Sequence, residues 1–260
     1  MKTISSIKKA KGATPLSVIT AYDALFAKLF NTKVDMILVG DSLNMSFNNK
    51  QDTLSATMEM MLYHTNAVCQ GAPDTFVICD MPFGTYTDEK TALENASKVY
   101  TQTQANAVKI EGGRERAHIV RSLTQNSIAV VGHIGLMPQF VRSEGGYIVK
   151  GKSEFEEEKL IQDAKAIEEA GAFCLVIEGV KAQVAKKITQ AVSIPTIGIG
   201  AGNETDGQVL VWSDMFGFFD EFQPKFVKKY LEGASLIQEA LEKYVKDVQT
   251  RQFPQQEHTY

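Results

Sequence analysis

Short apolar runs rich in β-branched residues alternate with longer amphipathic segments from residue 17 to the end of the chain. This alternation is typical of a parallel sheet built from strand and helix units. The short runs are apolar at successive positions, which indicates strands buried on both faces. We expect eight strands, at residues 17–23, 36–42, 75–81, 107–113, 128–135, 174–180, 195–202 and 209–216.

Helices are expected between the strands, for example at residues 88–104 and 155–170, and an amphipathic helix is expected at 224–249. The segment 155–170 has a glutamate-rich start and ends in Ala-Gly, as the helix dipole and C-capping favour. Eight such units predict an α/β fold, the (β/α)₈ TIM barrel. No repeat or polar linker divides the chain, so we expect a single domain over residues 1–260 with a short N-terminal extension and a C-terminal helix and tail.

Two long segments follow predicted strands, at residues 43–56 and 137–152. In a barrel, the loops after the strands surround the catalytic mouth, and long loops there are usually lids or binding loops. We expect that role for both segments.

Composition narrows the function classes. The chain has a net charge of -4 and is 44% hydrophobic and 22% charged, as in an ordinary globular protein. These values argue against nucleic acid or a membrane as the main partner, and they favour small molecules. The three cysteines are widely spaced among apolar residues, which indicates reduced core residues and a cytoplasmic protein.

Four acidic residues stand at the ends of four predicted strands: Asp41, Asp80, Glu111 and Glu178. The carboxyl ends of barrel strands converge on one face, so these residues can meet around one ligand. Carboxylate oxygens suit a hard cation such as Mg²⁺. The alternative is that each acid caps the following helix. A shared site is favoured because there are four acids and because Lys109 lies on the same strand face as Glu111.

Two further features leave alternatives open. His133 also lies at a strand end, where it is either a site residue or a hydrogen-bonded core histidine. The glycine-rich stretch at 195–208 either presents backbone N–H groups to an anion or packs closely in a tight turn. The sequence lacks the P-loop, the nucleophile elbow and zinc-ligand spacing, which disfavours those three chemistries.

Motifs along nearly the whole chain, from about Ile4 to His258, resemble one enzyme family. They include ITAYD, LVGDSLNM, CDMPFGTY, VKIEGG, GHIGLMPQ, GGYIVKGK, LVIEGV and IPTIGIGAGNETDGQ, in that order. The sequence is similar to the ketopantoate hydroxymethyltransferases. The resemblance implies a barrel of the phosphoenolpyruvate/pyruvate superfamily that uses Mg²⁺ and 5,10-methylenetetrahydrofolate to convert 3-methyl-2-oxobutanoate to 2-dehydropantoate in pantothenate biosynthesis. It also implies a homo-oligomer, commonly a decamer.

The same resemblance implies roles for individual residues. Glu178 is the catalytic base. The metal ligands are Asp41, Asp80 and Glu111, and the substrate contacts are Asp41, Ser42, Asp80, Lys109 and His133. The chain departs from the family pattern at Asn44, where glycine is usual, and at Met137 and Lys181, where threonine and proline are common. Only the first departure puts anything in doubt, namely the conformation of the loop after the second strand.

Two other functions remain as alternatives. A Mg²⁺-dependent 2-oxo acid lyase or mutase of the same superfamily would share the acids, and it would turn over without folate. A barrel that only binds a phosphorylated ligand through the glycine-rich stretch would show no metal-dependent isotope exchange in a substrate.

Overall fold

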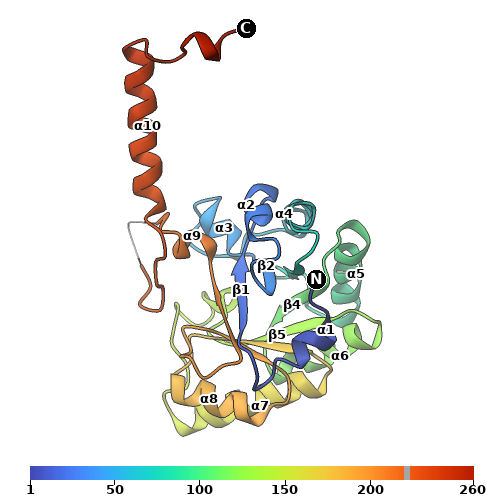
Figure 1. Ribbon diagram of the computed structural model, residues 1–260. Coiled ribbons are helices and arrows are strands. Elements are labelled where there is room, and N and C mark those ends of the chain that lie inside the picture. Colours follow the sequence, from blue (N-terminus) through green and yellow to red (C-terminus); the bar gives the residue numbers. More distant parts are fainter. Residues whose placement is uncertain (220–222) are drawn as a thin grey trace. The chain divides into compact units, whose positions relative to one another are not determined.

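Eight parallel strands form a closed barrel in the computed structural model, which describes residues 1–219 and 223–260 (Figure 1). Each strand pairs with the next along the chain, and the last pairs with the first. The strands are β1 Leu16–Thr20, β2 Met36–Val39, β3 Phe76–Asp80, β4 Ala107–Glu111, β5 Val130–Gly135, β6 Cys174–Glu178, β7 Thr196–Ile199 and β8 Gly207–Leu210. The TIM-barrel prediction is confirmed.

Helices alternate with the strands, as the pattern predicted. The barrel unit contains α1 Ile4–Lys8, α2 Ala24–Phe30, α3 Leu43–Ser46, α4 Met58–Gly71, α5 Glu89–Gln102, α6 Ala117–Gln125, α7 Glu154–Glu169 and α8 Ala182–Ala191. Thr57, Asp88 and Ser153 cap α4, α5 and α7, since each side chain accepts a hydrogen bond from the N–H three residues ahead. Helices α5 and α7 match the expected segments closely.

The eighth predicted strand is only partly correct. Strand β8 ends at Leu210, and Trp212–Met215 forms the short helix α9. A short apolar run gives no periodicity that separates a strand from a buried helical turn. The prediction of a strand over 211–216 is therefore wrong.

Alternate residues of each strand face the barrel interior. On β3 to β6 the inward positions near the amino ends are filled by apolar side chains such as Ile78, Val131 and Val176. About 10 Å³ of free space remains among the side chains there. Because the side-chain period of a strand is two, the next inward positions are the polar residues at the carboxyl ends. The packed lower layer thus supports a polar upper layer.

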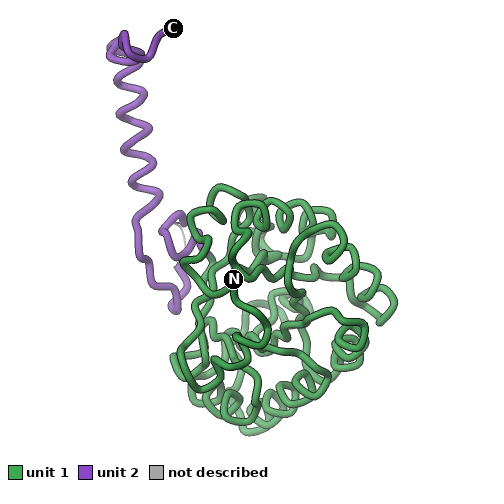
Figure 2. The backbone as a smooth tube through the Cα atoms, turned by 45° about the vertical axis from the view of Figure 1, so that its right-hand side comes forward, with its two compact units in different colours: residues 1–211 green, residues 212–260 purple. Residues whose placement is uncertain are grey.

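The chain divides into two compact units, residues 1–211 and 212–260 (Figure 2). The second contains α9, the helix α10 Gly233–Gln249 and a 3₁₀ turn at Gln256–His258. Helix α10 begins nine residues later than expected, because backbone bonds from Tyr230 to Met215 and from Gly233 to Phe216 hold the preceding segment outside a helix. That the whole chain is a single domain stays a prediction.

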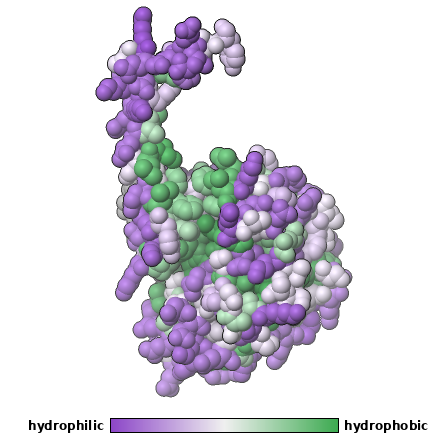
Figure 3. All heavy atoms as spheres, in the orientation of Figure 1, coloured by the Kyte–Doolittle hydropathy of each residue, from purple (hydrophilic) through white to green (hydrophobic). Residues whose placement is uncertain are grey.

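Helix α10 carries exposed apolar side chains at helical spacing. They include Ile237, Leu241, Tyr244 and Val248, and Figure 3 shows apolar atoms along this helix. These positions lie on one face of the helix. In the described ranges 1–219 and 223–260, the length and hydropathy of the helices fall short of those of a bilayer-crossing helix.

Candidate active site

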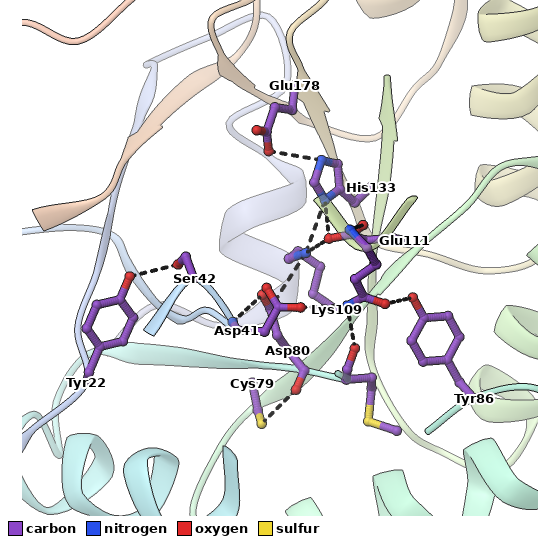
Figure 4. A network of polar contacts seen from close by, with 12 residues as sticks. Tyr22, Asp41, Ser42, Cys79, Asp80, Tyr86, Lys109, Glu111, His133 and Glu178 are labelled. Atoms are coloured by element: carbon purple, nitrogen blue, oxygen red, sulfur yellow. Dashed lines mark hydrogen bonds and ion pairs between the residues drawn. The ribbon is translucent and has the colours of Figure 1, made fainter. Parts of the chain in front are cut away.

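Polar side chains from four neighbouring strands meet at the carboxyl end of the barrel. Register places Asp80 beside Lys109, Glu111 beside His133, and Gly135 beside Glu178. Asp41 and Ser42 follow β2 at the same end. The structure therefore brings together the site residues that the sequence predicted (Figure 4).

Lys109 lies among the acids and is buried with them. Its Nζ atom is 3.3 Å from Asp80 Oδ1, 3.6 Å from Glu111 Oε1 and 3.1 Å from His133 Nδ1. Burial by itself lowers the pKa of Lys109, but Asp80 and Glu111 outweigh burial and raise it. The lysine is thus a fixed ammonium, and it lowers the pKa of Glu111 despite the burial of that carboxyl.

Asp41 is a buried acid beside two other carboxyl groups. Its backbone N–H donates to Asp80 Oδ2 at 3.1 Å, which holds the Asp80 carboxylate beside residue 41. Burial, followed by the charges of Asp80 and Glu111, raises the pKa of Asp41 well above its usual value. One lysine does not neutralise three adjacent carboxylates.

Gln139 was not predicted as a site residue, yet it connects the acids. Its backbone N–H donates to Glu111 Oε2 at 3.0 Å, and its Nε2 donates to Asp41 Oδ2 at 2.8 Å and to the Met81 carbonyl at 3.0 Å. Its Oε1 accepts from the Tyr86 hydroxyl. The only sequence signal was its position in GHIGLMPQ, because the turn that aims it at the acids is a tertiary feature.

His133 links the buried acids to Glu178. Its Nδ1 is 3.5 Å from Glu111 Oε1, and its Nε2 is 3.3 Å from Glu178 Oε2. An ammonium can only donate, so in the neutral ring that accepts from Lys109 at Nδ1 the proton lies on Nε2. In the protonated ring both nitrogens carry a proton, and they face Glu111 and Glu178. Burial and Lys109 lower the pKa of His133, whereas Glu111 and Glu178 raise it, and the net direction is upward.

Glu178 is the most accessible acid of the group. About 20% of its side chain is exposed, against 1–4% for Asp80, Glu111 and Lys109. A carboxylate at this position can reach both the buried cluster and a ligand in the barrel mouth. The geometry suits a proton acceptor.

Ser42 lies at the edge of the cluster. Its Oγ is 2.7 Å from the hydroxyl of Tyr22, whose pKa burial raises to about 12. A Cβ on Gly40 would lie 2.7 Å from Ser42 Oγ and 3.5 Å from Asp80 Oδ2. Glycine is therefore required at the end of β2 to admit both polar groups.

The alternative in which the four acids cap helices is wrong for the described residues. The helices that follow these strands begin at other N-caps, and the side chains of Asp41 and Glu111 accept bonds from Gln139.

For the glycine-rich stretch at 195–208, close packing is favoured over an anion site. A Cβ on Gly198 would lie 2.7 Å from Thr205 Oγ1, and a Cβ on Gly202 would lie 2.6 Å from Ala182 Cβ.

The donor set fits a hard divalent cation held by one or two carboxylates. Within residues 1–219 and 223–260, Asp80 Oδ1 and Glu111 Oε1 are buried without a hydrogen-bond partner. Oxygen donors with excess negative charge suit Mg²⁺, which keeps waters and substrate oxygens as its other ligands. In that same part of the chain, no three His, Cys, Asp or Glu side chains already form a metal-binding group. The side chains therefore fit a metal site in which water and substrate supply the remaining ligands.

Comparison with known proteins identifies the family. Residues 1–256 match the model of a family described as ketopantoate hydroxymethyltransferase. The chain belongs to the ketopantoate hydroxymethyltransferase family. It is 65% identical over 257 residues to a protein of Aliarcobacter butzleri named 3-methyl-2-oxobutanoate hydroxymethyltransferase, covering 99% of this chain and 96% of that one. The expectation of an enzyme of this family is confirmed.

Solved structures with low sequence identity share the fold of this family member. One is 2,3-dimethylmalate lyase, a member of the PEP mutase/isocitrate lyase superfamily, with a TM-score of 0.61, 16% identity, and coverage of 100% of this chain and 92% of that one. Another is phosphonopyruvate hydrolase in complex with oxalate and Mg²⁺, with a TM-score of 0.64, 11% identity, and coverage of 96% and 88%. Both structures share the barrel fold with this chain.

Proposed function

We propose that the enzyme transfers a hydroxymethyl group from 5,10-methylenetetrahydrofolate to C3 of 3-methyl-2-oxobutanoate, giving 2-dehydropantoate and tetrahydrofolate. Family membership and the name of the Aliarcobacter relative support the transfer. The structural observation that supports the mechanism is the position of Glu178. It is the accessible carboxylate beside a buried group of acids, a lysine and a histidine.

In this mechanism the substrate's carboxylate and 2-oxo group face the buried cluster. Lys109 offsets the negative charge there, and Asp41, Ser42, Asp80 and His133 contact the substrate. One or two of the acids Asp41, Asp80 and Glu111 would hold Mg²⁺, with water and substrate oxygens as its other ligands. When bound, the cation supplies Lewis-acid stabilisation of negative charge on the 2-oxo oxygen. Asp80 Oδ1 and Glu111 Oε1 support this assignment, because they lie near Lys109 but accept no hydrogen bond from the described residues.

Glu178 is the proposed base that removes the C3 proton. The resulting carbon nucleophile bonds to the methylene carbon of the donor, the two carbon–nitrogen bonds to the folate break, and water supplies the hydroxyl oxygen. The proton taken by Glu178 and one proton of the water end on the two folate nitrogens, which gives tetrahydrofolate. His133 Nε2 lies 3.3 Å from Glu178 Oε2, and in this proposal its positive charge, when the ring is protonated, orients the carboxylate. A positioned base of this kind contributes about 10²–10⁴ in rate.

Exchange of the C3 proton in deuterated water tests Glu178 directly, because exchange needs no donor. In Glu178→Gln we expect exchange to fall by about 10²-fold or more, with binding of 3-methyl-2-oxobutanoate retained. Glu169→Gln on the exposed surface is the matched control and should exchange as the wild type does. Exchange at the wild-type rate in Glu178→Gln would exclude this residue as the base.

Donor dependence tests the overall reaction. Wild-type enzyme should form 2-dehydropantoate only with methylenetetrahydrofolate, and a chelator should stop the reaction until Mg²⁺ is restored. Turnover of a 2-oxo acid without folate would instead establish the lyase or mutase alternative.

The enzyme is further proposed to be a homo-oligomer, a decamer by resemblance to its family. The exposed apolar face of α10 supports association, since contiguous apolar surface is costly in a monomer. Light scattering after size-exclusion chromatography measures the mass, and a monomer at micromolar concentration would contradict the proposal.

A cytoplasmic location is the last part of the proposal. Cys69, Cys79 and Cys174 are free and buried. Burial raises the pKa of Cys79 to about 12, so its reactive thiolate is scarce. Unpaired structural thiols are typical of proteins from reducing compartments.

A further inference from the structure

A cavity of about 360 Å³ lies beside the acid cluster. Its lining residues are Leu54, Ser55, Phe83, Gln139, Arg142 and Ser143. Gln139 belongs to both places, because the same residue that lines the cavity donates to Asp41 and Glu111. The volume is in the range that holds a small organic ligand. The cavity thus adjoins the acid cluster at Gln139.

The lining matches a flat ring system with polar edges. Phe83 keeps 54% of its surface exposed, although burial of a phenyl ring is favourable. The hydroxyl groups of Ser55 and Ser143 and the guanidinium of Arg142 provide polar groups around it. Aromatic faces with a few polar groups at the rim are typical of sites for heteroaromatic rings.

We propose that this cavity receives the ring system of the folate donor and that Asn44 is the positioning residue of its wall. The inference rests on the proposed function, which requires a second, ring-bearing substrate next to the carbon nucleophile. The cavity adjoins the acid cluster through Gln139, so a donor held there has its methylene group close to the first substrate.

Asn44 acts on the cavity through the loop at residues 52–55. Asn44 is buried, and its Nδ2 donates to the Asp52 carbonyl at 3.0 Å and to Ser55 Oγ at 2.9 Å. Both N–H groups of the amide therefore hold this loop. Asp52 in turn accepts from the Leu54 N–H at 3.1 Å.

The opposite wall is tied to the same loop. Arg142 pairs with Asp52, with Nη2 2.9 Å and Nε 3.0 Å from Asp52 Oδ2. The two long loops that the sequence predicted at the barrel mouth thus meet at this ion pair. A glycine at position 44 would supply neither of the two loop bonds. This side of the cavity therefore depends on the Asn44 side chain.

Phe83→Ala tests the cavity. We expect the KM for methylenetetrahydrofolate to rise at least about tenfold, the scale of one lost stacking contact, with the KM for 3-methyl-2-oxobutanoate within about twofold of the wild type. Calorimetric binding of tetrahydrofolate should weaken in parallel. Phe155→Ala, which removes a more exposed phenylalanine on α7, is the matched control and should change neither KM.

Ser143→Phe fills the cavity and tests it independently if Phe83→Ala folds poorly. The donor KM should again rise by about tenfold or more. For the wall, Asn44→Gly should raise the donor KM by about 5- to 30-fold, as expected for two lost hydrogen bonds, while the 2-oxo acid KM stays constant. A purely structural role would instead lower thermal stability and shift both constants together.

The outcomes separate the two proposals. If wild-type enzyme forms no product that depends on the donor, the proposed function fails and the cavity assignment fails with it. If the wild type is active but Phe83→Ala and Ser143→Phe keep the wild-type donor KM and tetrahydrofolate affinity, the cavity assignment is overturned and the function stands. If only Asn44→Gly leaves the donor KM unchanged, the positioning role is refuted.

Discussion

Replacement of Gln139 by leucine should destabilise the protein strongly. The change removes the donor to Asp41 Oδ2 and the acceptor of the Tyr86 hydroxyl, both of which are buried. A buried polar group without a partner costs about 1–3 kcal/mol, with charged groups at the upper end. The two unpaired groups should lower the free energy of unfolding by about 3–5 kcal/mol, and burial of the leucine side chain should raise it by about 1 kcal/mol.

A net loss of about 2–4 kcal/mol corresponds to a fall in Tm of roughly 4–16 °C for a chain of this size. Thermal unfolding at fixed protein concentration measures it, because association would otherwise shift the midpoint. Gln104→Leu at an exposed position is the control and should change stability by less than about 0.5 kcal/mol. A fall of under about 2 °C for Gln139→Leu would refute the view that this residue satisfies the buried acids.

Two further predictions concern charged groups. In Lys109→Met, the buried Asp80 and Glu111 lose their cation, so binding of 3-methyl-2-oxobutanoate should weaken at least about tenfold by calorimetry, and unchanged binding would exclude a substrate contact. Asp206→Asn should destabilise the barrel near neutral pH by about 1–3 kcal/mol, because Gly12, Thr196 and Lys11 donate to the carboxylate and, against burial, lower its pKa below 3.8. A carboxyl group with a lowered pKa in the native state stabilises the fold at pH values above its unfolded-state pKa, and this stabilisation is lost as the pH falls through the native pKa. The difference in unfolding free energy between wild type and Asp206→Asn should therefore shrink below about pH 4 in urea titrations. A constant difference down to about pH 2 would contradict the prediction.

Much of the site followed from sequence because it depends on one-dimensional regularities. The alternation of apolar runs with amphipathic segments gave the barrel, and parallel strands place their carboxyl ends together. The two-residue period of a strand then placed Lys109 and Glu111 on one face. In the structure Lys109 Nζ lies 3.6 Å from Glu111 Oε1. The resemblance to the family added the distinction between Glu178 and the other acids.

The prediction failed where a short apolar run did not distinguish a strand from a helix, and where contacts outside the predicted element set its start. The apolar stretch after Leu210 was read as strand, and it is helical in α9. The beginning of α10 depends on backbone bonds to the segment after α9, which no local propensity reveals. Burial and pairing in the folded chain override weak local preferences.

The sequence by itself determined the barrel, its family and the acids at the strand ends, because these are set by periodicity and by residue type. Only the tertiary structure decided how the acids are satisfied. Gln139 and Asn44 look like ordinary loop residues, and they matter because the turn after β5 and the loop after β2 bring them to Asp41, Glu111, Asp52 and Ser55. A hydrogen bond needs both partners at about 3 Å, and for partners on separate loops only the complete fold sets that distance.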